Sequence, residues 1–169
     1  MVVVTVLSAG FERGSVTFRF RPMRQSDAEA IAGWHYPEPF SFYDWAADPR
    51  DLAELLDPTA RGDGYFAVED EANNLVGFFH YREPHGDRLE IGLGLHPERT
   101  GQGLGRSFVE AGLDFGRRRF APTEFTLSVA SFNRRAITVY ERVGFSAVRV
   151  FAHWTNGGEW EFVEMQRPA

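Results

Sequence analysis

Residues 89–119 bring a strand, a glycine-rich loop and a helix together in direct succession, and this order limits the folds open to the chain. Apolar residues alternate over positions 89–95, and glycines follow at alternate positions from Gly101 to Gly105, at the start of a helix predicted over 104–119. Glycine lets the backbone approach a ligand closely, and the first N–H groups of a helix have no internal partner. The segment therefore predicts a phosphate-bearing ligand over Gly101 to Arg106. A turn that uses glycine only to change direction is the simpler alternative.

Two common nucleotide-binding motifs are excluded by the spacing of these glycines. They do not follow the GxGxxG pattern of dinucleotide-binding folds, and no Gly-Lys-Ser/Thr follows them as in a P-loop. The loop also lies in the middle of the chain, whereas a Rossmann loop normally follows the first strand. The predicted ligand is therefore phosphorylated but is neither NAD nor ATP.

Composition and charge narrow the function classes further. The chain has 169 residues, 43% of them hydrophobic, which suits one globular domain with a single core. Its net charge of −6 disfavours nucleic acid as a partner and is compatible with a cationic small-molecule or peptide acceptor. The absence of cysteine excludes a disulfide framework, a thiolate metal site and a cysteine nucleophile. The five histidines show no metal-binding spacing, so no metal is expected.

The N-terminal residues 1–15 are expected to form an arm or a short extra strand ahead of one domain over residues 16–169. Met1 to Leu7 is apolar, but it is too short to cross a bilayer and lacks the basic residues of a signal peptide. We therefore expect no membrane partner and a cytoplasmic protein. The sequence leaves the oligomeric state open, with a homodimer among the options.

Hydrophobic periodicity and turn residues predict the order strand, two helices, three-strand meander, helix, strand, helix and hairpin. Ser26 or Asp27 is expected to cap the first helix, and Asp48-Pro49 is a typical start for the second. Strands are expected over residues 16–21, 65–69, 75–82, 89–95, 125–129, 145–153 and 159–165, and helices over 27–34, 49–56, 104–119 and 133–143.

An aromatic run from Trp34 to Trp45 lies on a segment in which two prolines prevent a regular helix. One interpretation is that these rings cover one end of the core. The other is that they form the wall of an acceptor pocket, where aromatic faces suit an ammonium group. The substrate-binding candidates on this interpretation are Trp34, Tyr36, Phe40, Phe42 and Tyr43.

Two motifs in the second half of the chain resemble those of a known family. Residues 96–105, His-Pro-Glu-Arg-Thr-Gly-Gln-Gly-Leu-Gly, resemble the pyrophosphate-binding motif R/Q-x-x-G-x-G/A of the GNAT superfamily of N-acetyltransferases, except that Thr100 stands where Arg or Gln is usual. Residues 133–145 match the N-x-x-A-x-x-x-Y-x-x-x-G-F motif of the same family at every fixed position. The resemblance covers the chain from about Val16 to Met165.

The resemblance implies an α/β (α+β) GNAT-like domain that uses acetyl-CoA as co-substrate. Its sheet is expected to be mixed and mostly antiparallel, with six to seven strands flanked by about four helices. The strand before the glycine loop should separate from the next one and leave a cleft for acetyl-CoA. The implied coenzyme-binding residues are Leu93, Leu95, Thr100, Gly101, Gln102, Gly103, Leu104, Gly105, Arg106, Asn133 and Tyr140. Within this set, Leu93 and Leu95 would pair with pantetheine through their backbone. Asn133 is also a good helix cap in its own right.

Acetylation of an amine needs a base, because only about one lysine-like amine in a few thousand is neutral at pH 7. Glu90 is the candidate, since it shares a strand face with Gly92 and Gly94, which should leave that face open. The alternative is an exposed strand residue with no role.

The departing thiolate also needs a partner, and Tyr140 is the candidate, with core packing as its alternative role. A phenol has a pKa of about 10 and a thiol about 8.5, so full proton transfer is uphill by about 2 kcal/mol. A hydrogen bond to the sulfur is therefore the expected contribution.

The sequence thus predicts an N-acetyltransferase that transfers acetyl from acetyl-CoA to a primary amine, by direct attack in a ternary complex. A small-molecule acceptor is preferred. A protein or peptide N-terminal acetyltransferase and a non-catalytic acyl-CoA sensor are the alternatives.

Overall fold

The computed structural model describes residues 2–5, 16–83 and 86–169, so residues 1 and 6–15 of the predicted N-terminal arm lie outside the described part. The strands are β1 Val2–Thr5, β2 Thr17–Pro22, β3 Tyr65–Glu69, β4 Leu75–Arg82, β5 Arg88–Leu95, β6 Glu124–Ala130, β7 Ser146–Thr155 and β8 Gly158–Pro168. The α-helices are α1 Gln25–Ala32, α2 Pro49–Leu56, α3 Pro58–Arg61, α4 Gly105–Phe120 and α5 Arg134–Arg142. Short 3-10 helices are η1 Phe40–Tyr43, η2 Trp45–Ala47 and η3 Pro97–Arg99.

The strands form a single sheet in the order β1-β2-β3-β4-β5-β6-β8-β7. Every neighbouring pair is antiparallel except β5 and β6, which are parallel. The mixed, mostly antiparallel sheet predicted from the sequence is confirmed. The short β1 is the eighth strand of this sheet, and the one-turn α3 adds a fifth α-helix that the periodicity did not predict.

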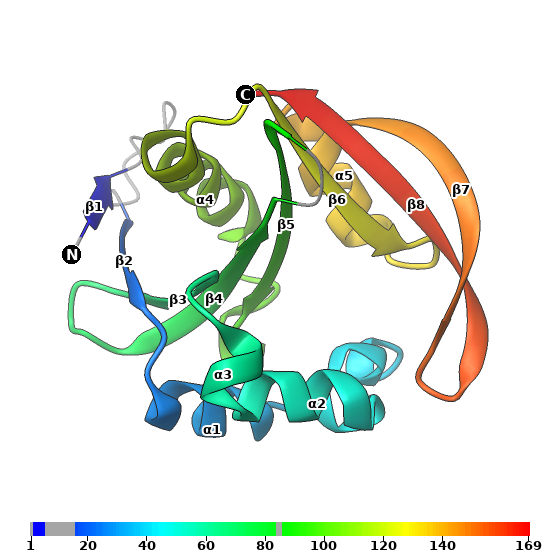
Figure 1. Cartoon of the computed structure of the whole chain (residues 1–169), viewed down its shortest axis with the longest axis horizontal. Coiled ribbons are helices and arrows are strands. Elements are labelled where there is room, and N and C mark those ends of the chain that lie inside the picture. Colours follow the sequence, from blue (N-terminus) through cyan, green and yellow to red (C-terminus); the bar gives the residue numbers. More distant parts are fainter. Residues whose placement is uncertain (1, 6–15, 84–85) are drawn as a thin grey trace.

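The parallel pair divides the sheet into two halves. β5 and β6 are paired only where Arg88–Glu90 lies beside Glu124–Thr126. Beyond that point β5 stays on β4 as far as Leu95, whereas β6 follows β8 as far as Ala130. The two strands therefore diverge, as Figure 1 shows between the green β5 and the yellow β6, and the predicted separation is confirmed.

Two hydrophobic clusters cover opposite faces of the sheet. The larger one joins α4 and α5 to the sheet and includes Phe79, Phe108 and Ile137. The smaller one joins α1 and α2 to the other face through Ile31 and Leu55. Figure 1 shows α4 and α5 on one side and α1, α2 and α3 on the other. A ligand in the gap between β5 and β6 is therefore accessible from both faces of the sheet.

Capping explains where the first helices begin. The Asp48 side chain accepts hydrogen bonds from the N–H groups of Arg50 and Asp51, which confirms the predicted start of α2. The prediction for α1 is wrong in detail, because the helix begins at Gln25. Asp27 occupies its third position, where the carboxylate accepts from the Arg24 N–H at 2.7 Å and pairs with the Arg21 guanidinium. The sequence did not reveal that ion pair, which holds Asp27 in the first turn of the helix, three residues after the N-cap Arg24.

None of the helices in the described ranges has both the length and the apolar character needed to cross a bilayer.

Candidate active site

The glycine loop presents a row of free backbone donors. Gly101 and Gly103 have φ angles of 74° and 77°, in the left-handed region that glycine adopts without strain. Leu104, the N-cap of α4, contributes no side-chain cap. Among the residues that the structure describes, the backbone N–H groups of 101–106 donate no hydrogen bond within the protein. The amides at the start of α4 are therefore not satisfied internally, which is the arrangement that an anion site requires.

The side chains of this loop contribute less than its backbone. Thr100 donates its hydroxyl hydrogen to the Pro97 carbonyl at 2.8 Å, and Gln102 donates to the Glu98 carbonyl at 2.6 Å. Arg106 pairs with Glu110 on the exposed side of α4. The loop therefore offers mainly N–H groups, consistent with the departure from the family motif at Thr100.

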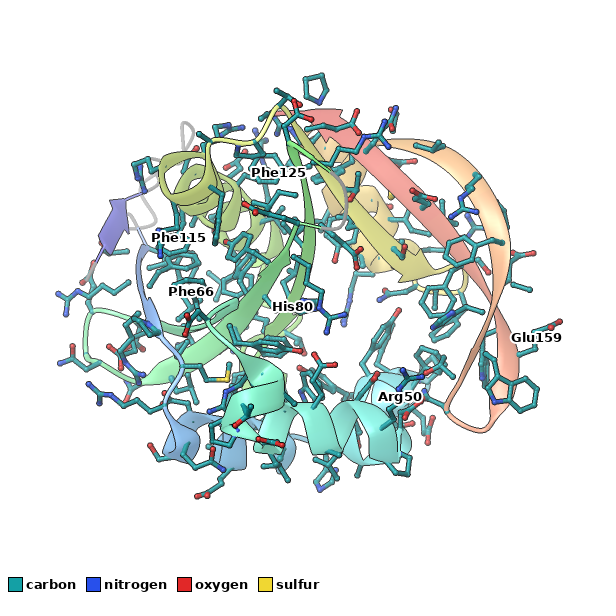
Figure 2. The ribbon with its side chains drawn as sticks, viewed as in Figure 1. Arg50, Phe66, His80, Phe115, Phe125 and Glu159 are labelled. Atoms are coloured by element: carbon teal, nitrogen blue, oxygen red, sulfur yellow. The ribbon has the colours of Figure 1, made fainter. Side chains whose placement is uncertain are left out.

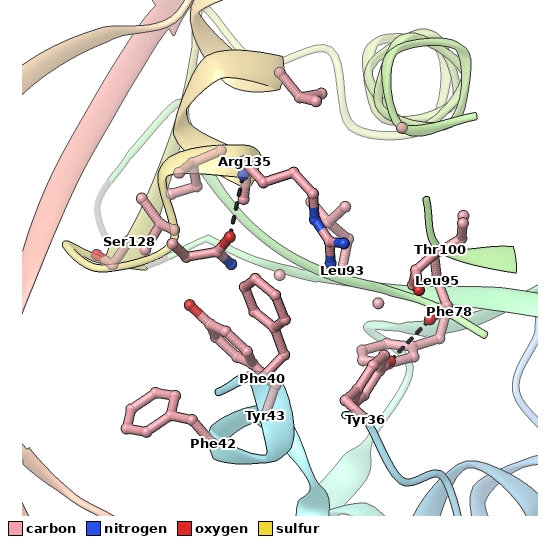
Figure 3. Close-up of a pocket in the computed structure, with 18 of the residues that line it drawn as sticks. Tyr36, Phe40, Phe42, Tyr43, Phe78, Leu93, Leu95, Thr100, Ser128 and Arg135 are labelled. Carbon is pink, nitrogen blue, oxygen red and sulfur yellow. Dashed lines mark hydrogen bonds between the residues drawn. The ribbon is translucent and has the colours of Figure 1, made fainter. Parts of the chain in front are cut away.

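The edge of β5 that faces the gap also carries unpaired backbone groups. The His96 N–H donates to Val76 on β4, so the alternating pattern of an antiparallel pair turns the N–H and C=O groups of Leu93 and Leu95 toward the gap. One of these groups is already occupied, because the Tyr36 hydroxyl donates to the Leu95 carbonyl at 2.8 Å (Figure 3). The Leu93 N–H and C=O are the groups best placed to pair with an extended ligand.

α5 brings Asn133 and Tyr140 to the opposite wall. The Asn133 Oδ1 accepts from the Ala136 N–H at 3.1 Å, so this residue caps α5 and also lines the cleft. The Tyr140 ring packs against Phe145, with a centroid separation of 6.0 Å, and it also lines the cleft. Burial, with a smaller effect from Tyr43, raises the pKa of the Tyr140 hydroxyl, which therefore stays protonated near neutral pH.

These elements enclose one cleft of about 710 Å³ that runs from the glycine loop through the gap to the α1–α2 side of the sheet. It brings together most of the residues predicted from the sequence: Tyr36, Phe40, Phe42, Tyr43, Glu90, Leu93, Leu95, Thr100, Gly101, Gly103, Gly105, Asn133 and Tyr140. It does not include Gln102, Leu104, Arg106 or Trp34 among its lining residues. Trp34 is buried in the smaller core, where its ring lies 4.9 Å from that of His96.

The aromatic run lies against the C-terminal hairpin. The Phe42 ring is 4.9 Å from Trp160 on β8, and its carbonyl accepts from the Asn156 side chain at 2.8 Å. Asp48 holds the same hairpin tip, because its Oδ2 accepts from the Thr155 hydroxyl at 3.0 Å and from the Asn156 N–H at 3.2 Å. The hairpin tip therefore contributes to the cleft wall, where Thr155 and Asn156 are among the lining residues.

One residue that the sequence did not single out also lies in this half of the cleft. His80 on β4 is paired with Gly92 on β5, and its ring stacks on Tyr65 at 5.1 Å. A Cβ atom at Gly92 would lie 1.7 Å from the His80 Nε2, and one at Gly94 would lie 2.3 Å from the Phe78 ring. The expectation that these glycines leave the strand face open is therefore wrong, because they make room for side chains of the neighbouring strand.

His80 and Glu90 both line the cleft on the α1–α2 side. The His80 Nδ1 is buried, with no hydrogen-bond partner among the described residues. Burial, helped by the nearby Arg82, lowers the pKa of His80 to about 3, so the ring is neutral near pH 7. A ring with so low a pKa is a weak base, so Glu90 remains the candidate base beside the gap.

Arg135 on α5 reaches into the cleft as well. Its guanidinium lies 4.3 Å from the centroid of the Phe40 ring, within the range of a cation–π contact (Figure 3). Among the described residues, Arg135 forms no ion pair. Its guanidinium group is therefore available to pair with an anionic ligand in the cleft. No group of three or more His, Asp or Glu side chains within the described ranges is arranged to hold a metal ion.

Comparison with known proteins identifies this arrangement. Residues 17–146 match the family model described as "Acetyltransferase (GNAT) domain". The chain belongs to the GNAT family. Mycothiol acetyltransferase from Propionibacterium freudenreichii subsp. shermanii is 32% identical over 118 residues, covering 68% of this chain and 36% of that protein. The enzyme of the same name from Streptomyces avermitilis is 34% identical over 140 residues, covering 78% of this chain and 43% of that protein. This GNAT chain thus spans less than half the length of these relatives.

Solved structures agree on the fold. Spermidine N-acetyltransferase from Vibrio cholerae, in complex with CoA and spermine, superimposes with a TM-score of 0.73 at 24% identity and covers 89% of this chain and 95% of that one. A GNAT-family acetyltransferase from Bacillus anthracis gives a TM-score of 0.71 at 17% identity, with 89% and 94% covered. At these identities the likeness concerns the GNAT fold alone.

Proposed function

We propose that this chain is an acetyl-CoA-dependent N-acetyltransferase that acts on a small-molecule primary amine. The observation that carries the proposal is the combination of free N–H groups at residues 101–106 with the gap between β5 and β6. The first suits a pyrophosphate, and the second suits an extended tail that pairs with the Leu93 backbone. A pantetheine chain that enters from the α4–α5 side would bring its thioester to the gap, where the acceptor arrives from the α1–α2 side.

The residues beside the gap can be given roles in direct transfer. The amine nitrogen attacks the thioester carbonyl, the C–S bond breaks, and the sulfur leaves as a thiolate. Glu90, acting through water, takes a proton from the acceptor ammonium. The Leu93 N–H is placed to polarise the carbonyl oxygen. Tyr140 donates a hydrogen bond to the leaving sulfur, which then takes up the proton that the acylated nitrogen loses. Because its pKa is raised, full proton transfer from Tyr140 is even less favourable than for an ordinary phenol.

The contacts between the hairpin tip and the segment before α2 favour a small acceptor over a peptide. A protein N-terminal acetyltransferase needs an open groove for several residues of extended backbone. Here the contacts of Asn156 with Phe42 and Asp48 join the hairpin tip to the segment before α2. The cleft beside these contacts is lined by Phe40, Tyr43 and carboxylates, which suits an amine better than an extended peptide backbone. The same reasoning favours a compact amine as the substrate.

A single assay tests the proposal and separates it from the sensor alternative. The chain contains no cysteine, so a thiol reagent reads released CoA without background from the protein. Binding of CoA at 100 times its Kd should stabilise the protein by about 2.7 kcal/mol, or about 8 °C in melting temperature. We expect this shift together with thiol release in the presence of acetyl-CoA and an amine. No shift with CoA would refute the proposal, and a shift without thiol release across an amine panel would favour a sensor.

A further inference from the structure

His80 is a polar residue of the cleft that the proposed mechanism leaves without a role. It lies on β4, near the centre of the molecule (Figure 2), and its side chain lines the cleft. Its Nδ1 is buried, and within the described part of the chain neither ring nitrogen has a hydrogen-bond partner. A buried polar group that is left unpaired is costly, so this ring is expected to meet a ligand or water.

The surroundings of the ring determine which nitrogen carries the proton. Burial, helped by Arg82, lowers the pKa of His80 to about 3, so the ring is neutral near pH 7. A neutral imidazole has one N–H donor and one acceptor nitrogen. A proton on the buried Nδ1 would leave a donor with no acceptor among the described residues, which is rarer in folded proteins than an unfilled acceptor. The single proton is therefore assigned to the Nε2.

The register of the sheet places this Nε2–H group over β5. His80 is paired with Gly92, and the Nε2 is the ring atom nearest to the position of a Gly92 Cβ, at 1.7 Å, with Cδ2 at 2.4 Å and Cε1 at 2.6 Å. Because β5 lies between β4 and the gap, a ring that reaches from β4 across β5 points its tip toward the gap. Tyr65 stacks on the ring, with the planes 22° apart, and limits its rotation.

The Leu93 N–H lies beside the tip of the ring. Leu93 follows Gly92 on β5, and its N–H points into the gap because alternate residues of β5 bond to β4. A backbone N–H and a side-chain N–H therefore point to the same side of β5 from neighbouring positions. Two preorganised donors of this kind are the arrangement that stabilises a negatively charged oxygen in acyl transfer.

We infer that His80 is a catalytic residue, whose Nε2–H donates a hydrogen bond to the thioester carbonyl oxygen together with the Leu93 N–H. The inference rests on the proposed function. As the amine nitrogen attacks the carbonyl carbon, the π electrons of the C=O bond move onto the oxygen, where both donors stabilise the charge. When the C–S bond breaks, that electron pair returns to form the amide carbonyl, and His80 has neither gained nor lost a proton. A neutral ring also does not repel a cationic acceptor.

Two substitutions at position 80 test this role, with acetyl-CoA and a panel of propylamine, benzylamine and phenethylamine. His80→Leu removes both ring nitrogens, and His80→Gln restores a neutral side-chain N–H. We expect His80→Leu to lower kcat about 100-fold, the loss typical for one oxyanion donor, and His80→Gln to recover about tenfold or more of it. The KM for acetyl-CoA should stay within about threefold, because the bond strengthens only in the transition state.

Phe66→Leu is the control for an ordinary loss of stability. Phe66 is buried in the larger core and is not among the residues that line the cleft. The melting temperature of each variant is measured alongside the kinetics. Phe66→Leu should lower the melting temperature and leave kcat within about twofold, because removing buried methylene groups affects stability and not the transition state.

Two spectroscopic measurements do not depend on activity. Acetyl-CoA labelled with carbon-13 at the thioester carbonyl should show a lower C=O stretching frequency when bound to wild type than when bound to His80→Leu, because a hydrogen-bond donor weakens the carbonyl bond. Nitrogen-15 NMR of wild type should show His80 as the Nε2–H form, without titration between about pH 5 and pH 8. The His80 signals are identified by their loss in His80→Gln.

The outcomes separate this inference from the proposed function. A kcat for His80→Leu within about threefold of wild type would overturn the role of His80. A lower kcat that His80→Gln does not recover, with an unchanged carbonyl frequency, would also overturn it and assign the ring to packing. An Nδ1–H ring in wild type would overturn it without any variant. Each of these results leaves the acetyltransferase proposal standing, whereas no thiol release by wild type with any amine would refute both.

Discussion

The fit between Gly92 and His80 gives the sharpest structural prediction. A Cβ at position 92 would lie 1.7 Å from the His80 Nε2, against about 3.4 Å for ordinary contact, so the ring must move by nearly 2 Å. Tyr65 stacks on the same ring at 5.1 Å and limits that movement. Overpacking of this kind costs about 1–3 kcal/mol, and losing the ring stack adds about 0.5–1.5 kcal/mol. A small gain from replacing glycine in a strand offsets part of this. We expect Gly92→Ala to destabilise the protein by about 2 kcal/mol, or about 6 °C in melting temperature.

A double-mutant cycle isolates the cause. In His80→Ala the clashing ring is absent, so adding Gly92→Ala should cost almost nothing. The stability of each variant is measured by urea denaturation followed by tryptophan fluorescence. Gly33→Ala is the control, since its Cβ would lie at an ordinary 3.5 Å from the nearest atom and its φ is negative. If Gly92→Ala costs the same with and without His80, to within about 0.5 kcal/mol, the steric explanation is refuted.

Three further predictions follow from the site. Tyr140→Phe should lower kcat more than it raises the KM for acetyl-CoA, and unchanged turnover would remove Tyr140 from the mechanism. Gly103→Ala should cost about 1–2 kcal/mol of stability, because φ is 77° at this position, and the backbone strain should weaken CoA binding in calorimetry. A steric clash does not contribute, because no atom lies within 4 Å of a Cβ placed there. Backbone hydrogen bonds from Arg50 and Asn156 lower the pKa of Asp48 below its ordinary 3.8, so Asp48 stabilises the fold above that pH and the effect is lost as pH falls through the lowered pKa. Wild type should therefore lose more stability than Asp48→Asn between about pH 5 and pH 3, as followed by melting temperature; parallel curves would contradict this.

Local signals in the sequence predicted most of the fold. The bounds of β3 and β4, Tyr65–Glu69 and Leu75–Arg82, agree with the alternation of apolar residues between turns. The start of α2 at Asp48-Pro49 and the cap of α5 at Asn133 agree with capping rules. These features depend on neighbours in the chain, so they can be read from it.

The errors arise where distant residues decide the outcome. Arg21, on β2, pairs with Asp27 and places that residue inside α1 instead of at its cap. The role of Gly92 depends on the register between β4 and β5, which puts His80 opposite it. Trp34 looked like its aromatic neighbours in the sequence, but the packing of α1 turns it into the smaller core. Such facts need the tertiary arrangement, and composition and spacing do not contain them.

The short pairing of β5 with β6 has a consequence for how the protein moves. Within the described residues, three residue pairs from Arg88–Glu124 to Glu90–Thr126 and the hydrogen bond from the Thr123 N–H to the Asp87 carbonyl join the two half-sheets through backbone, and α4 packs against α5 where Gly105 lies near Val139. A coenzyme lying across this joint would touch both halves and stiffen it, and its departure would free them again.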